Sequence, residues 1–461
     1  MSEPRAGRVG TWLVGTILMV AAVASRAEAQ EFEQGWNDPR IISPAGLGPR
    51  YSGLLGAGVG LLSKKPNFGV MTGEFVLQPR FFLEGEYRSN FFRVDTRNAD
   101  PDGVFSLHIR PGVALFNPDY DTVALSVGLD LDVFVPVSDS AAADQTNVGG
   151  RAHISAAFFP KKAFTLTLHE VFERTLFMRP TVVTNANQNH NIVGADASLH
   201  PGGRALDFTL GYAYDIIRYD DLDRIDTDQH DLRFLASWRF YPMTYLFLEW
   251  TLQPTTYTSR PVAADGGVGN FTDGTPFKAY AGLSGYITDR LGVLVRAGYG
   301  NTFLDDTVPG TEQFSSFIGQ LQVSWRFGAS SIVHLGFARD FDVSPLGGYV
   351  EYLRPYAAFT MRLSELVDLN LDFAYDLRSY GAWTPLALSN GDLPTASDPH
   401  RSENVIRAGA LLDFDITRVL GATIGYRYES IVSDYEVTTN GVQNFIGYDD
   451  HRVFASLNLR Y

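Results

Sequence analysis

Apolar and polar residues alternate along most of this chain. A clear example is the run from Leu206 to Ile216, in which every second residue is Leu, Phe, Tyr or Ile. Side chains of a β-strand point alternately to its two faces, whereas those of a helix repeat every 3.6 residues, so a period of two indicates a strand. Similar runs cover 123–135, 229–240 and 367–378. The pattern therefore predicts strands with one apolar and one polar face.

About eighteen such runs (roughly 16 to 20) follow one another to the C-terminus. They predict strands near 73–89, 104–115, 123–135, 148–159, 164–175, 188–200, 205–218, 229–240, 244–255, 277–287, 291–300, 315–327, 331–341, 350–362, 367–378, 403–415, 419–430 and 450–461. The connections tend to alternate between tight turns, such as 160–163 and 288–290, and long polar loops, the longest at 257–274, 379–402 and 431–447. Short periplasmic turns and long extracellular loops are typical of an outer-membrane β-barrel.

Aromatic residues gather near the predicted strand ends. On the apolar face, one set lies where strands should reach the periplasm: Phe158, Phe240, Phe327, Phe359, Phe414 and Tyr461. A second set lies near the opposite ends: Tyr87, Tyr214, Trp250, Tyr299, Tyr375 and Tyr428. Two aromatic girdles around an apolar band are expected where rings sit at both bilayer interfaces.

The apolar residues are spread along the chain and not gathered into long blocks. Although 45% of the residues are hydrophobic, no segment beyond the N-terminal region offers eighteen consecutive apolar residues, so we expect no transmembrane helix there. A secreted sandwich, propeller or solenoid would turn the apolar faces inward, but no fixed sequence repeat is visible. A closed barrel would turn them toward lipid and leave no unpaired strand edge. We predict an all-β, antiparallel, up-and-down transmembrane barrel, wide enough for an aqueous channel.

Three regions are expected along the chain. Residues 1–29 have the features of a secretory signal peptide, with Arg5 and Arg8 before an apolar run and cleavage between Ala29 and Gln30. An uncleaved anchor would need about 20 apolar residues, more than this run offers. Residues 30–72 are rich in Pro and Gly and are predicted to form a periplasmic tail or small hatch. The barrel then occupies 73–461.

The C-terminal strand carries a second indication of location. Its apolar residues alternate through Leu457 and Leu459 into the terminal Tyr461. This ending resembles the strand that the outer-membrane barrel assembly machinery recognises. We therefore expect that machinery and outer-membrane lipid as partners, in the outer membrane of a diderm bacterium.

The composition excludes several other classes of protein. With 37 Lys and Arg against 52 Asp and Glu, the formal charge is −15, so a nucleic-acid partner is not expected. The chain has no cysteine, which excludes disulfides and thiolate metal sites. His108, His153, His169 and His334 lie on separate predicted strands without catalytic or metal-binding spacing, so neither an enzyme, a metal nor a cofactor is predicted.

Counting the strand phase places charged residues of both signs on the polar, inward face. The candidate pore-lining residues are Arg110, Arg151, Arg233, Arg239, Arg296, Arg326, Arg354, Arg407, Arg427, Arg452, Glu84, Glu86, Asp130, Asp132 and Asp372. Guanidinium groups could bind carboxylate or phosphate groups of a passing solute, and Tyr280, Tyr286, Tyr352 and Tyr356 could stack on sugar rings. The alternative is that these arginines and acids pair with one another and stiffen the wall.

Glu170 does not fit this pattern. Alternation from Leu166 and Leu168 points it toward lipid, where a charge in the middle of the membrane is costly. Either a β-bulge turns this side chain inward, or the predicted phase of the strand is wrong.

Two segments resemble a known family. The first predicted strand carries Glu86-Tyr87-Arg88-Ser89-Asn90-Phe91-Phe92, and the next carries Leu107-His108-Ile109-Arg110-Pro111-Gly112-Val113. These segments resemble the β-barrel porins of exopolysaccharide secretion loci, whose architecture is also similar to that of the eighteen-stranded alginate and poly-N-acetylglucosamine porins.

The resemblance implies a function without catalysis. It implies passive transport of a secreted polysaccharide across the outer membrane, with a glycan cargo and a periplasmic polysaccharide export protein as partners. The alternative with the same fold is a general diffusion porin or a channel for hydrophobic substrates.

Overall fold

The computed structural model of the 461-residue chain consists of β-strands and their connections. The structure describes residues 70–72, 75–93, 100–117, 121–137, 146–178, 186–201, 205–220, 226–241, 243–258, 273–305, 312–328, 330–344, 348–381, 401–433, 436–439, 442–445 and 447–460. The predicted signal peptide, the cleavage site at Ala29 and Gln30 and most of the tail at 30–72 lie outside these residues, as does Tyr461. No helix in the described ranges is both long and apolar enough to span a membrane.

Eighteen long antiparallel strands form the wall of a barrel, as predicted. They are β2 (Phe75–Arg88), β3 (Val104–Phe116), β4 (Val123–Pro136), β5 (Asn147–Phe158), β6 (Phe164–Met178), β7 (Ala186–Leu199), β8 (Leu206–Tyr219), β9 (Thr227–Tyr241), β10 (Thr244–Leu252), β12 (Phe277–Tyr286), β13 (Leu291–Asn301), β14 (Ser315–Phe327), β15 (Ser331–Ser344), β16 (Gly348–Ser364), β17 (Val367–Tyr380), β18 (Ser402–Phe414), β19 (Leu420–Ser433) and β22 (Tyr448–Arg460).

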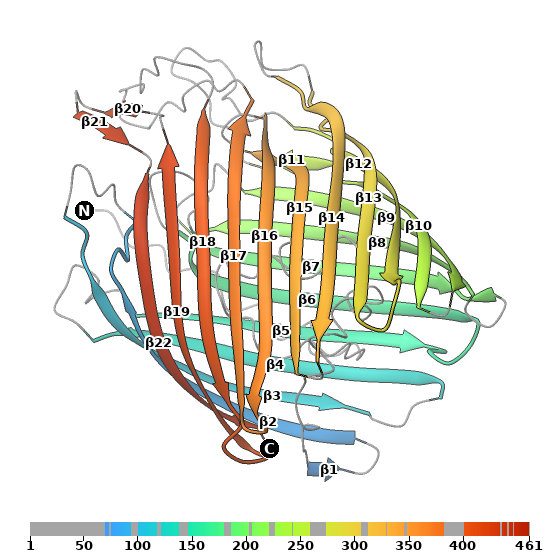
Figure 1. Ribbon diagram of the computed structural model, residues 1–461, viewed down its shortest axis with the longest axis horizontal. Coiled ribbons are helices and arrows are strands. Elements are labelled where there is room, and N and C mark those ends of the chain that lie inside the picture. Colours follow the sequence, from blue (N-terminus) through green and yellow to red (C-terminus); the bar gives the residue numbers. More distant parts are fainter. Residues whose placement is uncertain are drawn as a thin grey trace, which may run out of the picture.

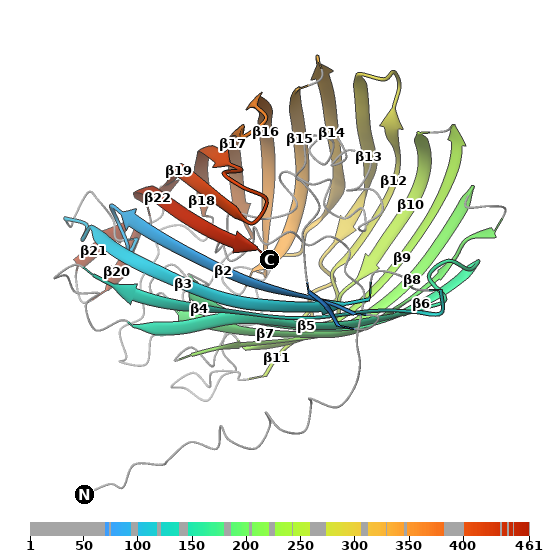
Figure 2. The ribbon, with the colours of Figure 1, turned by 90° about the horizontal axis from the view of Figure 1, so that it is seen from below.

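Each long strand pairs with its neighbours along the chain, and the first closes against the last. β2 pairs with β22 from Arg80 opposite Arg460 to Arg88 opposite Arg452. Figures 1 and 2 show the strands side by side around one ring. Closure leaves no free edge in the wall, which is the condition for placing a β-sheet in lipid.

Four short strands lie outside the ring of eighteen. β1 (Val70–Thr72) pairs antiparallel with the first residues of β2, and β11 (Thr255–Tyr257) continues the pairing of β10 with β9. β20 (Glu436–Thr439) and β21 (Val442–Phe445) form a hairpin within the segment predicted as a long loop at 431–447. The predicted alternation missed these elements because three or four residues are too few to show a period.

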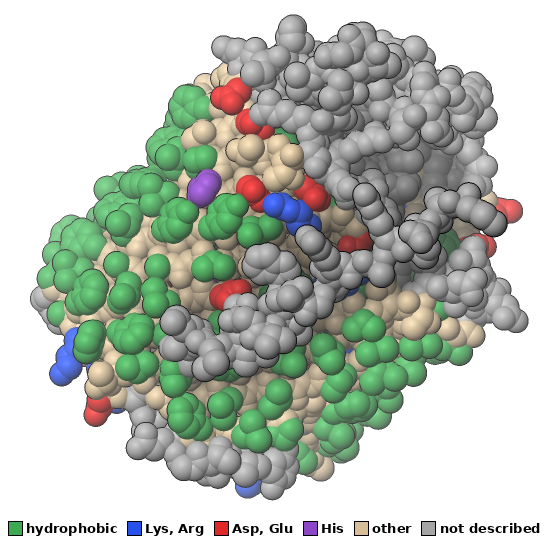
Figure 3. All heavy atoms as spheres, turned by 180° about the vertical axis from the view of Figure 1, so that it is seen from behind, with side chains coloured by type: hydrophobic (Ala, Val, Ile, Leu, Met, Phe, Trp, Pro, Cys, Tyr) green, Lys and Arg blue, Asp and Glu red, His purple; other side chains and the backbone are tan. Residues whose placement is uncertain are grey.

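The apolar faces of the strands point outward. Leu210 on β8, Leu321 on β14 and Leu335 on β15 remain 49–54% exposed, although they lie in the middle of paired strands. Figure 3 shows hydrophobic side chains spread across one face of the outer surface, with few charged groups between them. A soluble sandwich would bury these residues, so their exposure identifies a surface that faces lipid.

The two ends of the barrel differ, as the connection lengths predicted. Most connections at the end where β22 finishes are short, and in one of them Lys161 lies 2.8 Å from the carboxylate of Asp121. The hydrogen bond from Lys161 lowers the pKa of Asp121, which lies outside the membrane-spanning strands. The longest connections, 381–401 and 253–276, are at the other end, where 345–347 is the one short exception.

Both sets of aromatic residues, apart from Tyr461, lie on the outward face. At the long-loop end two matching groups occur. The hydroxyl group of Tyr212 lies 2.8 Å from Nδ1 of His230, with Tyr214 beside the same ring, and Tyr426 lies 2.9 Å from Nδ1 of His451, with Tyr428 beside it. The sequence did not point to these histidines. Amphipathic rings of this kind suit the membrane interface.

The bulge considered at Glu170 is absent. β6 pairs without a break from Leu166 to Arg174 with β5, and from Phe164 to Thr175 with β7. Glu170 therefore shares the outward face with Leu168 and Phe172, and the predicted phase of the strand is correct.

Candidate functional site: the inner wall of the barrel

The structure places all fifteen predicted pore-lining residues on the inward face of their strands. Seven of the ten arginines lie on β12 to β22 or on β3, and the five acids lie on β2, β4 and β17. They do not form one uniform lining, because some are buried in ion-pair clusters and others are partly exposed. Their part in conduction remains a prediction.

A first cluster joins the first and last long strands of the barrel. Glu84 on β2 lies 3.6 Å from Nη2 of Arg110 on β3 and 3.2 Å from Nη2 of Arg452 on β22. Arg452 also reaches Glu86 at 2.5 Å, and Nε of Arg110 lies 3.1 Å from Asp132 on β4. Because Glu84 is only 1% exposed, its charge is balanced by these arginines and not by water.

Glu84, Glu86 and His108 lie close enough together to hold a cation. The same carboxylates, however, already contact Arg110 and Arg452. Nδ1 of the His108 imidazole lies 2.9 Å from Oδ1 of Asp132. Because guanidinium groups already pair with both carboxylates, we describe the cluster as an ion-pair network.

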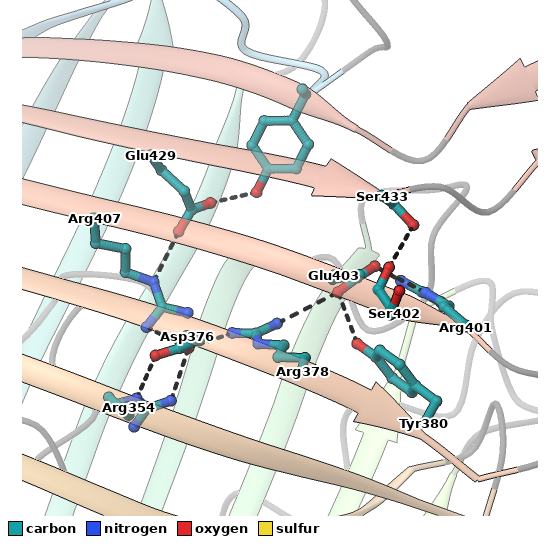
Figure 4. Close-up of polar contacts among 11 residues, drawn as sticks. Arg354, Asp376, Arg378, Tyr380, Arg401, Ser402, Glu403, Arg407, Glu429 and Ser433 are labelled. Carbon is teal, nitrogen blue, oxygen red and sulfur yellow. Dashed lines mark hydrogen bonds and ion pairs between the residues drawn. The ribbon is translucent and has the colours of Figure 1, made fainter.

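A second cluster centres on Asp376 of β17 (Figure 4). Arg354 on β16 donates to both carboxylate oxygens of Asp376, at 2.5 and 2.9 Å. Arg378 donates at 3.0 Å, and Nη1 of Arg407 on β18 lies 3.4 Å away. Three cations thus surround one carboxylate that is 1% exposed.

The cluster continues toward the long-loop end. Glu403 on β18 accepts hydrogen bonds from Arg401 and, at 2.9 Å, from the hydroxyl group of Tyr380 (Figure 4). Nε of Arg407 donates to Glu429 on β19 at 3.3 Å, and Tyr448 on β22 donates to the same carboxylate. The two clusters together line an arc from β16 through β19 and β22 to β4, which we call the interlocked wall.

Sequence reasoning listed only part of this wall. Its candidates omitted several members of the two clusters: Arg88, Arg378, Arg401, Glu403, Glu429 and Asp450. The signal was present, since Arg88 follows Glu86 by two positions and Glu429 follows Arg427 by two, so each pair shares one face. Continuing the alternation to the strand ends would have found them.

The tyrosines predicted to stack on sugars are mostly engaged by the wall itself. The guanidinium carbon of Arg296 lies 4.3 Å from the ring centroid of Tyr280, and that of Arg354 lies 4.5 Å from Tyr352. The hydroxyl group of Tyr356 accepts from Gln320 at 2.8 Å and donates to Gln322 at 2.7 Å. These rings are buried, so they do not offer free faces to a solute.

The opposite arc, on β6 to β9, has a different character, and we call it the open wall. Asp196 on β7 lies 3.1 Å from Arg233 on β9 and 3.6 Å from His169 on β6. His190 and Asp215 are 3.9 Å apart. The side chains of Asp196, His190 and Arg233 are 22%, 29% and 37% exposed. Charges on this arc are therefore more exposed than Glu84 and Asp376 of the interlocked wall, each of which is 1% exposed.

Two of the described histidines contact a serine hydroxyl group. His153 lies 3.3 Å from Ser126 and His334 lies 2.7 Å from Ser324. Within the described residues neither imidazole also has a carboxylate partner, which a serine nucleophile with an oriented base would require.

Comparison with known proteins gives one family. The model described as "Putative beta-barrel porin 2" matches residues 65–461, which cover all the long strands. No curated protein matches the sequence.

Several solved outer-membrane structures are similar at low identity. OccAB3 from Acinetobacter baumannii is 11% identical, with a TM-score of 0.47, over 84% of this chain and 99% of that one. OpdK from Pseudomonas aeruginosa, crystallised with vanillate, is 11% identical, with a TM-score of 0.45, over 84% and 99%. The siderophore receptor PirA from Pseudomonas aeruginosa is 10% identical, with a TM-score of 0.42, over 87% and 81%.

Proposed function

Because the chain belongs to the Putative beta-barrel porin 2 family, we propose that it is a diffusion channel that admits small charged solutes along its open wall. The chain is an outer-membrane β-barrel porin of a Gram-negative bacterium. The proposal also specifies the kind of solute, and this part is based on the residues of the inner wall.

The observation that supports the proposal is the exposure of charge on β6 to β9. Arg233, Asp196 and Asp215 present both signs to the lumen. Exposed charges attract counter-ions and polar solutes, and fixed groups of both signs let either kind of ion enter. A lumen intended for hydrophobic substrates would not keep these groups accessible.

Polysaccharide export, the function implied by the resemblance, has less support. The family description specifies a porin and no cargo. The arginines expected to bind acidic groups of a glycan, such as Arg354 and Arg407, are engaged by Asp376 and Glu429. Releasing a buried guanidinium group from its carboxylate would cost about 3–5 kcal/mol, which a weakly held cargo cannot supply. The small-solute alternative therefore agrees better with the wall.

Transport can be measured with the pure protein. We expect planar bilayers to show discrete conductance steps in potassium chloride, and proteoliposomes to swell in small sugars and amino acids. Dextran of several thousand daltons should not enter. Transport of long glycans without small-solute flux would refute the proposal and restore polysaccharide export. No transport step requires catalysis.

A gene deletion provides the test in cells. Small-solute uptake should fall while surface polysaccharide stays normal. Loss of surface polysaccharide with normal uptake would contradict the proposal. A strain that carries the plasmid-borne gene serves as the matched control.

A further inference from the structure

The open wall carries more acidic than basic side chains on its inward face. The carboxylates that point into the lumen from β6 to β9 are Glu173, Asp196, Asp207, Asp215 and Asp231. The arginines on the same face of these strands are Arg233 and Arg239. With the histidines neutral, this part of the lumen therefore has a net negative charge. A negative potential inside a channel raises the local concentration of cations.

His190, Asp215 and Asp231 follow a diagonal line across β7, β8 and β9, which are neighbours in the wall (Figure 1). His190 pairs with Ile217, two residues from Asp215 on β8. Asp231 pairs with Ala213, two residues from Asp215 in the other direction. Side chains in diagonal positions on one face of a sheet lie within reach of one another. Asp215 thus has a histidine toward the long-loop end and a carboxylate toward the short-turn end.

Each of these three side chains has a buried polar atom without a hydrogen bond. The atoms are Nε2 of His190, Oδ1 of Asp215 and Oδ1 of Asp231. Nε2 of His190 lies 3.9 Å from Oδ2 of Asp215, which is too long for a hydrogen bond. Among the described residues, no arginine or lysine forms an ion pair with Asp215. A buried polar atom needs a partner, and water or an ion can supply it where the protein does not.

The chemistry of these atoms indicates which ion suits them. Zn²⁺ binds imidazole nitrogen and carboxylate oxygen at about 2.0–2.2 Å, so two of its ligand atoms lie about 3.4 Å apart in a tetrahedral site and at most about 4.3 Å apart. The 3.9 Å between His190 and Asp215 lies between these values. Mg²⁺ and Ca²⁺ take oxygen ligands, whereas imidazole is a ligand of transition-metal ions. One nitrogen beside carboxylates therefore favours a divalent transition-metal ion.

Other pairs of histidine and aspartate on the open wall lack this arrangement. Nδ1 of His169 lies 3.6 Å from Asp196, but Asp196 also pairs with Arg233 at 3.1 Å. The guanidinium group already balances that carboxylate and repels a metal ion. His200 forms a direct hydrogen bond with its aspartate, at 2.5 Å. Within the described residues, the pair of His190 has neither an arginine partner nor a direct hydrogen bond.

From these observations we propose that the open wall binds divalent transition-metal ions between His190 and Asp215 and passes them along the diagonal to Asp231. The inference rests on the proposed diffusion channel and specifies one class of its solutes. A structural zinc site has four protein ligands, so a site with two holds the ion weakly. Conduction requires such weak binding at successive positions. The unpaired Oδ1 of Asp231 provides the next ligand toward the short-turn end.

Metal binding can be measured independently of transport. Protein purified in detergent without a polyhistidine tag is equilibrated with zinc chloride by dialysis. His190→Gln should raise the dissociation constant for Zn²⁺ by about tenfold or more, because loss of even an outer partner of a metal site costs roughly that much. His169→Gln is the matched control on the neighbouring strand and should bind Zn²⁺ as the native protein does. Asp215→Asn is a second test variant, and heat-modified mobility on gels verifies that each barrel is folded.

Single-channel recording then tests whether the ion uses this path. In potassium chloride, Zn²⁺ should reduce the current of the native protein, and Ca²⁺ at the same concentration should reduce it much less. The block by Zn²⁺ should weaken by about tenfold or more in His190→Gln and persist in His169→Gln. Equal block by the two cations, or an equal effect of the two substitutions, would overturn the inference.

The two measurements also separate this inference from the proposed function. A native protein that conducts potassium chloride but binds no Zn²⁺ would refute the metal site and leave the diffusion channel intact. A native protein that binds Zn²⁺ through His190 but conducts no ions would support the metal site and refute the diffusion channel.

Discussion

The interlocked wall and the open wall carry the same kinds of residue in the same strand phase, yet they differ in how strongly their carboxylates are buried and paired. In the first, Asp376 is 1% exposed and contacts Arg354, Arg378 and Arg407. In the second, Asp215 is 15% exposed and lies 3.9 Å from Nε2 of His190. This difference shows that a charged side chain on the inward face of a strand can still be buried in the wall.

The supply of arginine accounts for much of this difference. A guanidinium group presents five donors in a planar fork and can bridge two carboxylates on neighbouring strands, as Arg407 bridges Asp376 and Glu429. On β6 to β9 two acids have an amide or an imidazole as partner: Asp231 lies 3.4 Å from Nε2 of Gln253, and Asp215 lies 3.9 Å from Nε2 of His190. These two contacts are long, and the side chain of Asp215 stays 15% exposed.

The largest expected effect is on the stability of the interlocked wall. Asp376→Ala removes the acceptor of three guanidinium groups and should lower the free energy of unfolding by about 3–5 kcal/mol, because it leaves buried charges unpaired. Urea titration in lipid vesicles, followed by heat-modified mobility on gels, measures this loss. Asp215→Ala is the control on the open wall and should cost less than about 1 kcal/mol. Equal losses in the two variants would abolish the distinction between the walls.

A smaller effect on the free energy of unfolding is expected when a buried but uncharged contact is removed. Tyr356→Phe deletes one hydroxyl group that bonds to Gln320 and Gln322, both buried and uncharged. Two hydrogen bonds at about 0.5–1.5 kcal/mol each predict a loss of about 1–3 kcal/mol in the same titration. A loss as large as that of Asp376→Ala would mean that burial alone, and not charge, stabilises the wall. Tyr299→Phe, at an exposed hydroxyl group, is the matched control.

The smallest effect should appear in selectivity and not in stability. Arg233→Glu changes the exposed charge of the open wall by two units. At about 8 Å in water each unit is worth about 0.5 kcal/mol, so the free energy of an anion rises by about 1 kcal/mol and that of a cation falls by about the same amount. The ratio of anion to cation permeability should therefore fall roughly thirtyfold. Reversal potentials in a salt gradient measure this ratio. Arg354→Gln should shift it much less, and a larger shift in that variant would show that solutes reach the interlocked wall.

The sequence alone predicted the fold almost completely. The period of two located the eighteen long strands, and β14 begins and ends at the predicted residues. The same counting placed Arg110, Arg354 and Arg452 on the inward face. Counting strand phase could not distinguish the two walls. The exposure of a side chain depends on its neighbours on several other strands, and these neighbours are known only once the barrel is closed. Nor could it reveal that the faces of Tyr280 and Tyr352 are covered by arginines.

The predicted defect at Glu170 shows a different limit. Phase counting was correct there, but its conflict with membrane energetics suggested an error in register. The strand ladder is continuous, so the conflict belongs to the outer surface and not to the alignment of strands. When one residue breaks a sequence pattern that the rest of the fold follows, that residue often has a functional role.

The seam between β2 and β22 has a consequence for how the molecule is made. Arg88 contacts Asp450 and Arg452 contacts Glu84 across 362 and 368 positions of sequence, so the first and last strands hold each other. Without residues 448–460, β19 and β2 each have an unpaired edge, and Glu84 and Arg88 lack their partners on the last strand. Closure of the wall therefore requires this last thirteen-residue strand.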